Sequence, residues 1–400
     1  MTERLRKTLC ITVLFCIFTS LFTGCDFVKG KATKQQELVE NYLNACIKFD
    51  YHEAAGFVEK RHDSFSDVVL SFPQSDIVEL VLSKAVFEVT EIENDRAAVN
   101  FVIPDIDRAL RRELVAALSV EEIEDILNDS PLTITEVLEF DFIQEGREWK
   151  IDSLSTADFA EYVSAIGVDV AEEIRIGLGA KNYFDAVMST VASGDLSALM
   201  NLLYGNEPSA PGGSGFHGVN VNDLIAEFFS ANYGSAEYET EIIAFSEDEV
   251  TLQVSGTILD FPGSYEQTVT TNHDLTVNFL KTIISIVTDF ERIDYDVDSE
   301  EYDSLYYDYF EAKIDFYLEC LAEADRTTFT IVIPISIDEQ GNYSMDLYYI
   351  EAMQGQILNP GFPTEFYIDA LEELLEEEVI TEDEFYDYLA TSPSYFMNVF

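Results

Sequence analysis

The clearest pattern in the chain is an alternation of apolar and acidic residues within 132–144. It comprises Leu138, Phe140 and Phe142 on one side of an extended segment and Glu139 and Asp141 on the other. A period of two with one apolar face is typical of an antiparallel strand that is buried on one side only. The turn Glu145-Gly146 and a second extended segment at 147–154 follow. This region is therefore predicted to form a hairpin.

Helical spacing precedes and separates the extended segments. Apolar residues follow Thr33 at intervals of three and four, namely Leu38, Tyr42, Ala45, Cys46 and Phe49. This spacing predicts a helix with one buried face, and Asp50 starts a second short helix. A first hairpin is predicted at 87–103, and helices fill 106–128 before the alternating strand.

The same order of elements occurs a second time. Asn182-Tyr183-Phe184 is similar to Asn41-Tyr42-Leu43, and the segment starting at Asp195 is similar to the one starting at Asp50. The remaining elements predicted for the second half are a hairpin at 238–258, helices at about 274–290 and 301–324, and strands at 327–338 and 343–351. Two diverged copies of one α+β unit, each a set of helices with a curved antiparallel sheet, explain this order better than a single domain.

In this order of elements, the two copies resemble the cone-shaped, cystatin-like fold shared by ketosteroid isomerase and the nuclear transport factors. The resemblance covers most of the chain and rests on the pattern of elements. It implies a curved sheet around helices, and it fits secreted bacterial lipoproteins, in which this fold is frequent. The long helical segments of the second copy exceed a minimal cone.

The pattern of residues 361–400 matches neither copy and predicts a C-terminal helical hairpin. A helix is expected from Pro363 to Glu378, and Thr381-Glu-Asp-Glu384 is a capping box that opens a second short helix. The segment around Ile380 resembles the small two-helix modules found at the C-terminus of many bacterial proteins, although Glu378-Val379 replaces their Gly. A helix pair docked on the second domain is the alternative.

At the start of the chain, an apolar run over 9–22 follows a basic segment and precedes small residues. These are the parts of a secretory signal. A membrane-spanning helix takes about 17–25 apolar residues, which this run does not reach. The segment Phe22-Thr23-Gly24-Cys25 resembles a bacterial lipobox, with Phe22 where Leu is usual. The resemblance implies a diacylglycerol thioether on Cys25 and cleavage before it; an ordinary secreted protein with a leftover Cys is the alternative.

The resemblance implies a protein on the bacterial cell membrane, lipid-anchored and facing outside the cytoplasm. The lysines beside it, Lys29, Lys31 and Lys34, either contact anionic headgroups, at about 1 kcal/mol each, or are only solvated linker charges. The predicted organisation is a signal peptide at 1–24, a lipidated tether at 25–33, α+β domains at 34–156 and 157–360, and a helical segment at 361–400.

The composition limits the partners of the protein. The chain has 77 acidic and 22 basic residues, and removal of one Glu and three basic residues with segment 1–24 changes the formal net charge from −55 to −57. Nucleic acid is excluded as a partner because its binding requires Lys and Arg to neutralise phosphates. An apolar content of 47% predicts a folded rather than a disordered protein. Anionic lipid should repel this surface too, so contact with the bilayer is expected through the anchor only. The other candidate partner is an envelope protein or a small ligand.

Catalytic and metal signatures are missing from the sequence. Cys46 and Cys320 lie in apolar helical patterns typical of buried thiols, and a disulfide between them stays open. The four histidines lack the paired spacing of metal ligands. The cone fold can host an isomerase with a carboxylate base, but alternation puts Asp141 on the face opposite its Phe neighbours. We expect no catalytic residue and no cofactor.

Asp294, Asp296 and Asp298 alternate as at the start of a calcium loop. Ser299 stands where such a loop has Gly, and Leu305 stands where it has a bidentate Glu. A solvated acidic face beside the Tyr-rich helix at 301–324 is the favoured interpretation. The Tyr stripe of that helix is typical of a core, and its polar tips also suit a groove for sugar or peptide.

Together these features predict a non-enzymatic, membrane-anchored binding or interaction protein of the cell envelope. One alternative is a receptor for a small sugar, peptide or lipid that uses the interior of a cone. The other is a calcium-responsive adhesion or assembly module built on the acidic stretch.

Overall fold

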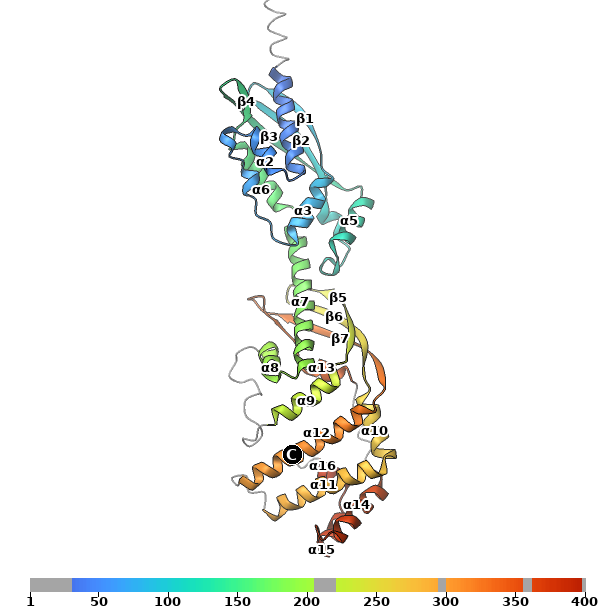
Figure 1. The fold of residues 1–400 in the computed structure, drawn as a ribbon. Coiled ribbons are helices and arrows are strands. Elements are labelled where there is room, and N and C mark those ends of the chain that lie inside the picture. Colours follow the sequence, from blue (N-terminus) through green and yellow to red (C-terminus); the bar gives the residue numbers. More distant parts are fainter. Residues whose placement is uncertain (1–30, 205–220, 294–299, 355–361, 398–400) are drawn as a thin grey trace, which may run out of the picture. The chain divides into compact units, whose positions relative to one another are not determined.

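A computed structural model describes residues 31–204, 221–293, 300–354 and 362–397 (Figure 1). It divides the chain into two compact units, Met1–Ile176 and Gly177–Phe400, called unit 1 and unit 2 below. Each unit contains a four-stranded antiparallel sheet together with helices. The predicted α+β class is therefore confirmed.

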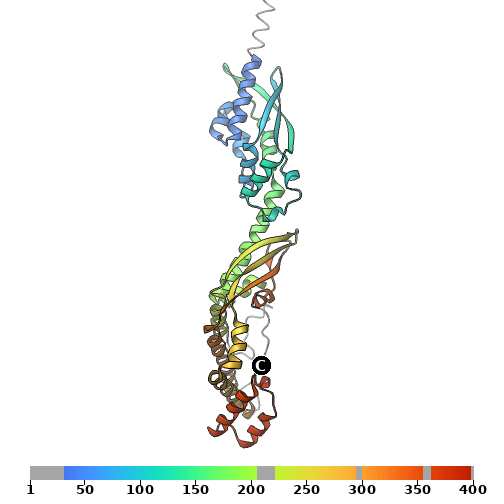
Figure 2. The ribbon, with the colours of Figure 1, turned by 90° about the vertical axis from the view of Figure 1, so that its right-hand side faces the viewer.

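Unit 1 begins with a helix over residues 31–47, called the N-terminal helix below. Its sheet has the order β1-β2-β3-β4, and in Figure 2 the blue helices lie to one side of the strands. The further elements are α2 (Tyr51–Phe57), η1 (Glu59–Arg61), η2 (Ser64–Asp67), α3 (Gln74–Ser83), β1 (Val86–Glu93), β2 (Arg96–Pro104), α4 (Ile106–Leu110), η3 (Val115–Ala117), α5 (Val120–Asp129), β3 (Thr133–Glu145), β4 (Glu148–Ile151), α6 (Ser155–Ala165) and the first part of α7 (Val168–Ser193).

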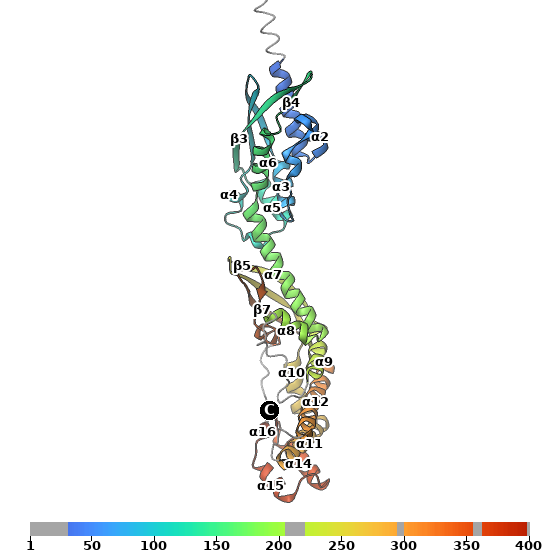
Figure 3. The ribbon, with the colours of Figure 1, turned by 90° about the vertical axis from the view of Figure 1, so that its left-hand side faces the viewer.

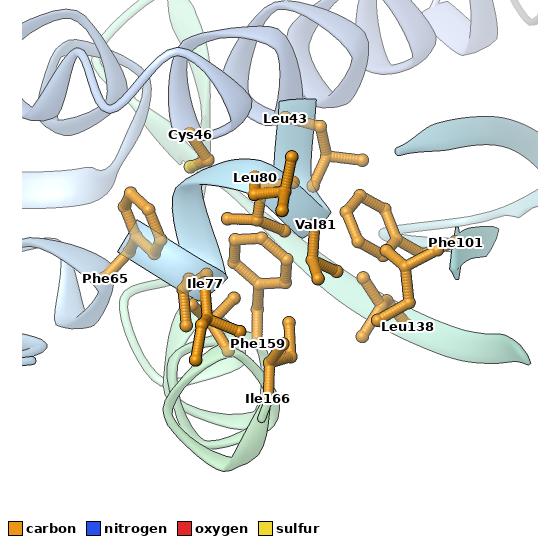
Figure 4. Close-up of a cluster of buried hydrophobic side chains, with 14 of the residues drawn as sticks. Leu43, Cys46, Phe65, Ile77, Leu80, Val81, Phe101, Leu138, Phe159 and Ile166 are labelled. Atoms are coloured by element: carbon orange, nitrogen blue, oxygen red, sulfur yellow. The ribbon is translucent and has the colours of Figure 1, made fainter. Parts of the chain in front are cut away.

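The core of unit 1 forms between the sheet and the helices. Phe140 and Phe142 are buried, whereas Asp141 lies on the outer face and pairs with Arg96 of β2 at 2.8 Å. The alternation predicted for β3 is therefore confirmed. Figure 4 shows how α3 inserts Ile77 and Val81 among side chains from the N-terminal helix, the sheet and α6.

Unit 2 has the sheet order β5-β6-β7-β8. Its elements are the rest of α7, α8 (Leu196–Tyr204), α9 (Asn222–Tyr233), β5 (Glu237–Phe245), β6 (Glu249–Leu259), α10 (Phe261–Thr271), α11 (His273–Arg292), α12 (Glu300–Ala322), β7 (Arg326–Ile337), β8 (Tyr343–Ser344), α13 (Tyr348–Ala352), α14 (Thr364–Glu376), α15 (Glu382–Leu389) and α16 (Pro393–Met397). A helical core forms from α9–α12 and α14–α16, and α11 lies beside both α12 and α14 (Figures 1 and 3).

The prediction of a strand at 343–351 is wrong beyond its first two residues. β8 ends at Ser344, and α13 begins at Tyr348. The Asp346 carboxylate accepts a hydrogen bond from the Tyr348 backbone N–H at 2.9 Å, and the Asp346 carbonyl accepts one from the Tyr349 N–H at 3.2 Å. These local bonds favour a turn over a strand, because Asp competes for backbone donors in this way.

Corresponding local structures recur in the two units. Asp50 caps α2 by accepting from the Glu53 N–H at 2.9 Å, and Asp195 accepts from the Ala198 N–H at the same distance. The second strand of each sheet ends at an Asp that caps the next helix, Asp105 before α4 and Asp260 before α10. The first hairpin of each sheet also has a register shift in its leading strand. These matches agree with the internal repeat expected from the sequence.

The division between the units lies later than the boundary expected after residue 156. α6 belongs to unit 1 because Phe159 and Val163 are buried in its core. The C-terminal helices do not stand apart from unit 2 either. The Tyr367 hydroxyl donates to the Tyr388 carbonyl at 2.7 Å, and the Tyr309 hydroxyl donates to the Phe396 carbonyl at 3.0 Å. These helices are therefore part of the helical core of unit 2.

Candidate functional site

An open pocket of about 1030 Å³ lies in unit 1 between the N-terminal helix, α2 and the β3–β4 hairpin. We call it the Trp149 pocket, after the one Trp of the chain. The side chains that give it its chemistry are Lys31, Lys34, Arg147, Trp149 and Lys150, together with Glu37, Asp95 and Glu148. Its wall thus combines an aromatic ring with charged groups, as in sites that orient a polar ligand.

Two local structures bring these side chains together. On the N-terminal helix, the pocket residues Lys31, Lys34 and Leu38 follow at intervals of three and four, which places them on one face. On the other wall, Trp149 pairs with Gln144 at the edge of the sheet. The β3–β4 turn requires Gly146, whose φ is +66°, a backbone conformation that side chains disfavour.

Lys31 joins the two walls of the pocket. Its ammonium lies 4.6 Å from the centre of the Trp149 ring and 2.9 Å from an Asp95 carboxylate oxygen. A cation over an indole ring contributes about 0.5–1 kcal/mol at exposed sites. The Lys150 ammonium donates to the Gly56 carbonyl of α2, which ties β4 to the helices. The indole ring is thereby held in one place at the pocket wall.

The charge of the Trp149 pocket differs from that of the whole chain. Four basic and three acidic side chains line it, whereas the chain has 22 basic and 77 acidic residues. Neither Lys34 nor Arg147 forms an ion pair with any other described residue. Glu37 and Glu148 of the lining likewise form no ion pair with a described residue, so the pocket has a net charge of +1, which favours an anionic ligand over a cationic one.

The interior of unit 1 holds a second polar group, the carboxyl of Asp63, which is only 1% exposed. The Tyr42 hydroxyl donates to Asp63 Oδ1 at 2.9 Å, and the Phe65 N–H donates to the same oxygen at 3.1 Å. Oδ2 has no hydrogen-bond partner in the part of the chain that is described. Burial raises the pKa of Asp63, and it also raises the pKa values of Tyr42 and Cys46 nearby. Aromatic and aliphatic side chains fill this interior.

We expect Asp63→Asn to change the pH dependence of unit 1 stability. The folded state holds the Asp63 proton more tightly than the unfolded state, because burial raises its folded pKa. The stabilisation from this proton is present at low pH and is lost as the pH rises through the folded pKa. Asn resembles the protonated acid, so the wild-type free energy of unfolding relative to that of the variant should fall as the pH rises from the ordinary pKa of an Asp carboxyl through the raised pKa of the folded state.

Urea unfolding followed by Trp149 fluorescence measures this difference for unit 1. Asp125→Asn, at an exposed position on α5, is the control and should change the pH dependence little. If the free energies of unfolding of the wild type and Asp63→Asn change with pH in parallel, the pKa of Asp63 is not raised in the folded state.

Unit 2 has a shallower groove of about 480 Å³ between α11 and α12. The rings of Phe279 and Phe316 form its floor and are stacked at 4.1 Å with an angle of 7° between their planes. One side of α12 lines the groove with the carboxylates Asp308, Glu311, Asp315 and Glu319. In a chain this acidic, such a row is typical of a solvated helix face.

The structure places only some of the residues that the sequence singled out. Cys25, its lipobox neighbours and the acidic triplet Asp294, Asp296 and Asp298 lie outside the described residues. Cys46 and Cys320 are free, buried thiols in different units, so no disulfide joins them. Tyr302, Tyr306 and Tyr309 are at most 2% exposed, which makes the Tyr stripe of α12 part of the core.

Neither the Trp149 pocket nor the Asp63 carboxyl was predicted from the sequence. Lys31 and Lys34 were interpreted mainly as linker charges. The segment Arg147-Glu-Trp-Lys150 was the available signal, because it places the only Trp between two cations in an acidic chain. Asp63 carries no comparable signal among 77 acidic residues.

Comparisons with known protein families, curated proteins and solved structures found no match to this chain. Among the described residues, no group of three or more His, Cys, Asp or Glu side chains is arranged to hold a metal ion. No helix in the described ranges is long and apolar enough to cross a membrane.

Proposed function

We propose that the mature protein is a lipid-anchored, extracytoplasmic binding protein of the bacterial envelope, without enzymatic activity, whose ligand binds in the Trp149 pocket. The observation that carries this proposal is the position of the pocket, which begins at Lys31, six residues after Cys25. A binding site this close in sequence to the anchor acts at the membrane surface.

The geometry of unit 1 supports binding more than catalysis. The polar group that most resembles an acid or base, Asp63, is enclosed by core side chains and is 1% exposed. A general acid or base must come within hydrogen-bond distance of its substrate. The accessible groups are instead the cations and the indole ring of the Trp149 pocket, which suit recognition.

The small-ligand receptor remains within this proposal, with the Trp149 pocket in place of a cone interior. The resemblance to the ketosteroid-isomerase-like fold agrees with the two curved sheets and stays an expectation. The calcium-responsive module depends on Asp294, Asp296 and Asp298, which lie outside the described residues, and it stays a prediction from the sequence.

We expect Cys25→Ala to release the protein from the membrane, because two acyl chains on this residue would anchor it durably. Intact mass and membrane fractionation after expression in a bacterium measure this. The wild type should be membrane-bound and heavier than its mature polypeptide by the lipid, and the variant should lose that lipid mass.

Cys46→Ala is the matched control, since this thiol is buried within unit 1 and should carry no lipid. A soluble wild type whose mass contains no lipid would refute the anchor, and with it the placement of the pocket at a membrane.

A further inference from the structure

We infer that the Trp149 pocket binds the anionic headgroups of the same membrane that holds the lipid anchor, so that unit 1 docks on the bilayer. This inference rests on the lipid anchor proposed above and specifies the ligand class of the pocket. The shared chemistry of such ligands is a phosphate ester, which Lys and Arg recognise by charge-assisted hydrogen bonds.

The length of the tether supports a lipid ligand. Lys31 is the sixth residue after Cys25, and a fully extended chain spans at most about 3.5 Å per residue. Lys31 therefore stays within about 20 Å of the lipidated residue, and Lys34 is one helical turn further. A pocket tethered this closely meets headgroups at a high effective concentration, so that weak binding suffices.

The charge of the pocket also supports a lipid ligand. An anionic membrane repels a mature protein with a net charge of −57, the full-chain value of −55 less the net +2 of segment 1–24, unless a basic surface faces it. The Trp149 pocket offers a weakly basic surface: its lining has four basic and three acidic side chains, and Lys34 and Arg147 have no ion-pair partner among the described residues. The attraction acts over about 8 Å, the Debye length at physiological salt, and the tether is short enough to bring the pocket within that distance of the membrane.

The aromatic wall of the pocket supports a lipid ligand as well. An indole ring prefers the headgroup region of a bilayer, where its apolar body and its polar N–H are both accommodated. Trp149 lies at the edge of the sheet with Lys31 over its ring, and its side chain is half-buried. An open pocket with a partly accessible ring fits a headgroup that is presented by a flat surface.

The test uses Trp149 itself as the probe, since it is the only Trp of the chain. Lipidated protein is reconstituted into vesicles of phosphatidylcholine alone or of equal parts phosphatidylcholine and phosphatidylglycerol. Quenching of its fluorescence by acrylamide, which is uncharged, is then compared. We expect quenching to be at least about twofold weaker in the anionic vesicles, because a docked pocket shields the ring, and to recover at high salt.

The double variant Lys34→Glu, Arg147→Glu should remove the difference between the two vesicles. Lys48→Glu is the matched control: this exposed Lys follows the N-terminal helix, does not line the pocket, and should preserve the difference. Equal quenching of the wild type in both vesicles would overturn the inference. Protection by free glycerol phosphate in neutral vesicles, without any effect of phosphatidylglycerol, would also overturn it, in favour of a soluble anion.

A second experiment tests headgroup binding independently of the lipid on Cys25. The chain from Asp26 to Phe400, which keeps every described residue, is mixed with the same vesicles at millimolar lipid. Shielding of Trp149 by the anionic vesicles alone would support headgroup binding even if Cys25 carried no lipid. Lipidated Cys25 with unshielded Trp149 in both arms would retain the anchor and reject the docking.

Discussion

Phe159→Ala should lower the free energy of unfolding of unit 1 by about 3–5 kcal/mol, the usual cost of removing a buried Phe. The ring is 1% exposed and lies among the rings of Tyr42, Phe65 and Phe101, with centroid distances of 6.2, 5.5 and 5.6 Å. These neighbours come from the N-terminal helix, η2 and β2, so that one cavity weakens contacts among three elements and α6. A small domain has only about 5–15 kcal/mol of stability, so this loss is large.

Trp149 again makes the measurement selective for unit 1. Urea unfolding followed by its fluorescence reports unit 1, whereas far-ultraviolet circular dichroism reports both units. Val69→Ala is the control, since this side chain is 93% exposed and should change stability by no more than about 0.5 kcal/mol. A loss below about 1 kcal/mol for Phe159→Ala would show that this aromatic cluster does not hold unit 1 together.

The sequence predicted those elements whose pattern is local. β3 follows from the alternation at Leu138, Phe140 and Phe142, because one residue in two must face the core in a half-buried strand. The Asp caps at Asp50 and Asp195 follow from the chemistry of helix starts, which acts over only a few residues. Both copies of the α+β unit could therefore be recognised without any structure.

Elements that depend on distant contacts were predicted less well. The apolar residues near 347–350 fit a strand by composition, but the Asp346 turn and the burial of Ile350 make α13 instead. The division of the chain was placed too early because the packing of α6 against the sheet is not visible in its own periodicity. In the first case the local hydrogen bonds of Asp346 decide against the strand, and in the second the contacts of α6 with the rest of unit 1 decide the boundary.

The Trp149 pocket shows the same limit for function. Lys31 and Lys150 are far apart in sequence and meet only because the N-terminal helix packs beside the β3–β4 hairpin. The charge of each Lys, taken alone, is common in linkers. What distinguishes them is the pocket that both line, in which Lys31 lies over the indole ring, and the acidity of the remaining chain; the pocket requires the fold.

Unit 2 shows how a copy of the unit diverges. The segment between the second and third strands contains α4 and α5 in unit 1, whereas in unit 2 it contains the long helices α10, α11 and α12. These helices join α14–α16 in a helical core, which buries the Tyr stripe of α12. The buried side chains of the unit 2 sheet, such as Val254 and Ile333, are not among the buried residues of this helical core, although Leu259 of β6 packs against it.

Gly256→Val in β6 should destabilise the sheet of unit 2, although strand propensity alone predicts the opposite. Val is favoured in strands and Gly is disfavoured. A Cβ at Gly256, however, would overlap the Glu237 carbonyl oxygen and lie 2.8 Å from Tyr238 Cα, both backbone atoms of the adjacent β5. Backbone cannot move aside as a flexible side chain can, so we expect a loss of about 3 kcal/mol, at the upper end of the usual range for overpacking.

Amide hydrogen exchange measured by mass spectrometry resolves this effect by element. Peptides from β5 and β6 should exchange faster in Gly256→Val, while peptides from α3 and β3 of unit 1 should keep the wild-type rates. Ser255→Val is the matched control because it adds the same side chain one position earlier in β6, on the opposite face of the sheet. It should leave exchange unchanged or slower. Slower exchange in Gly256→Val would show that propensity outweighs the close approach of β5 and β6 at this position.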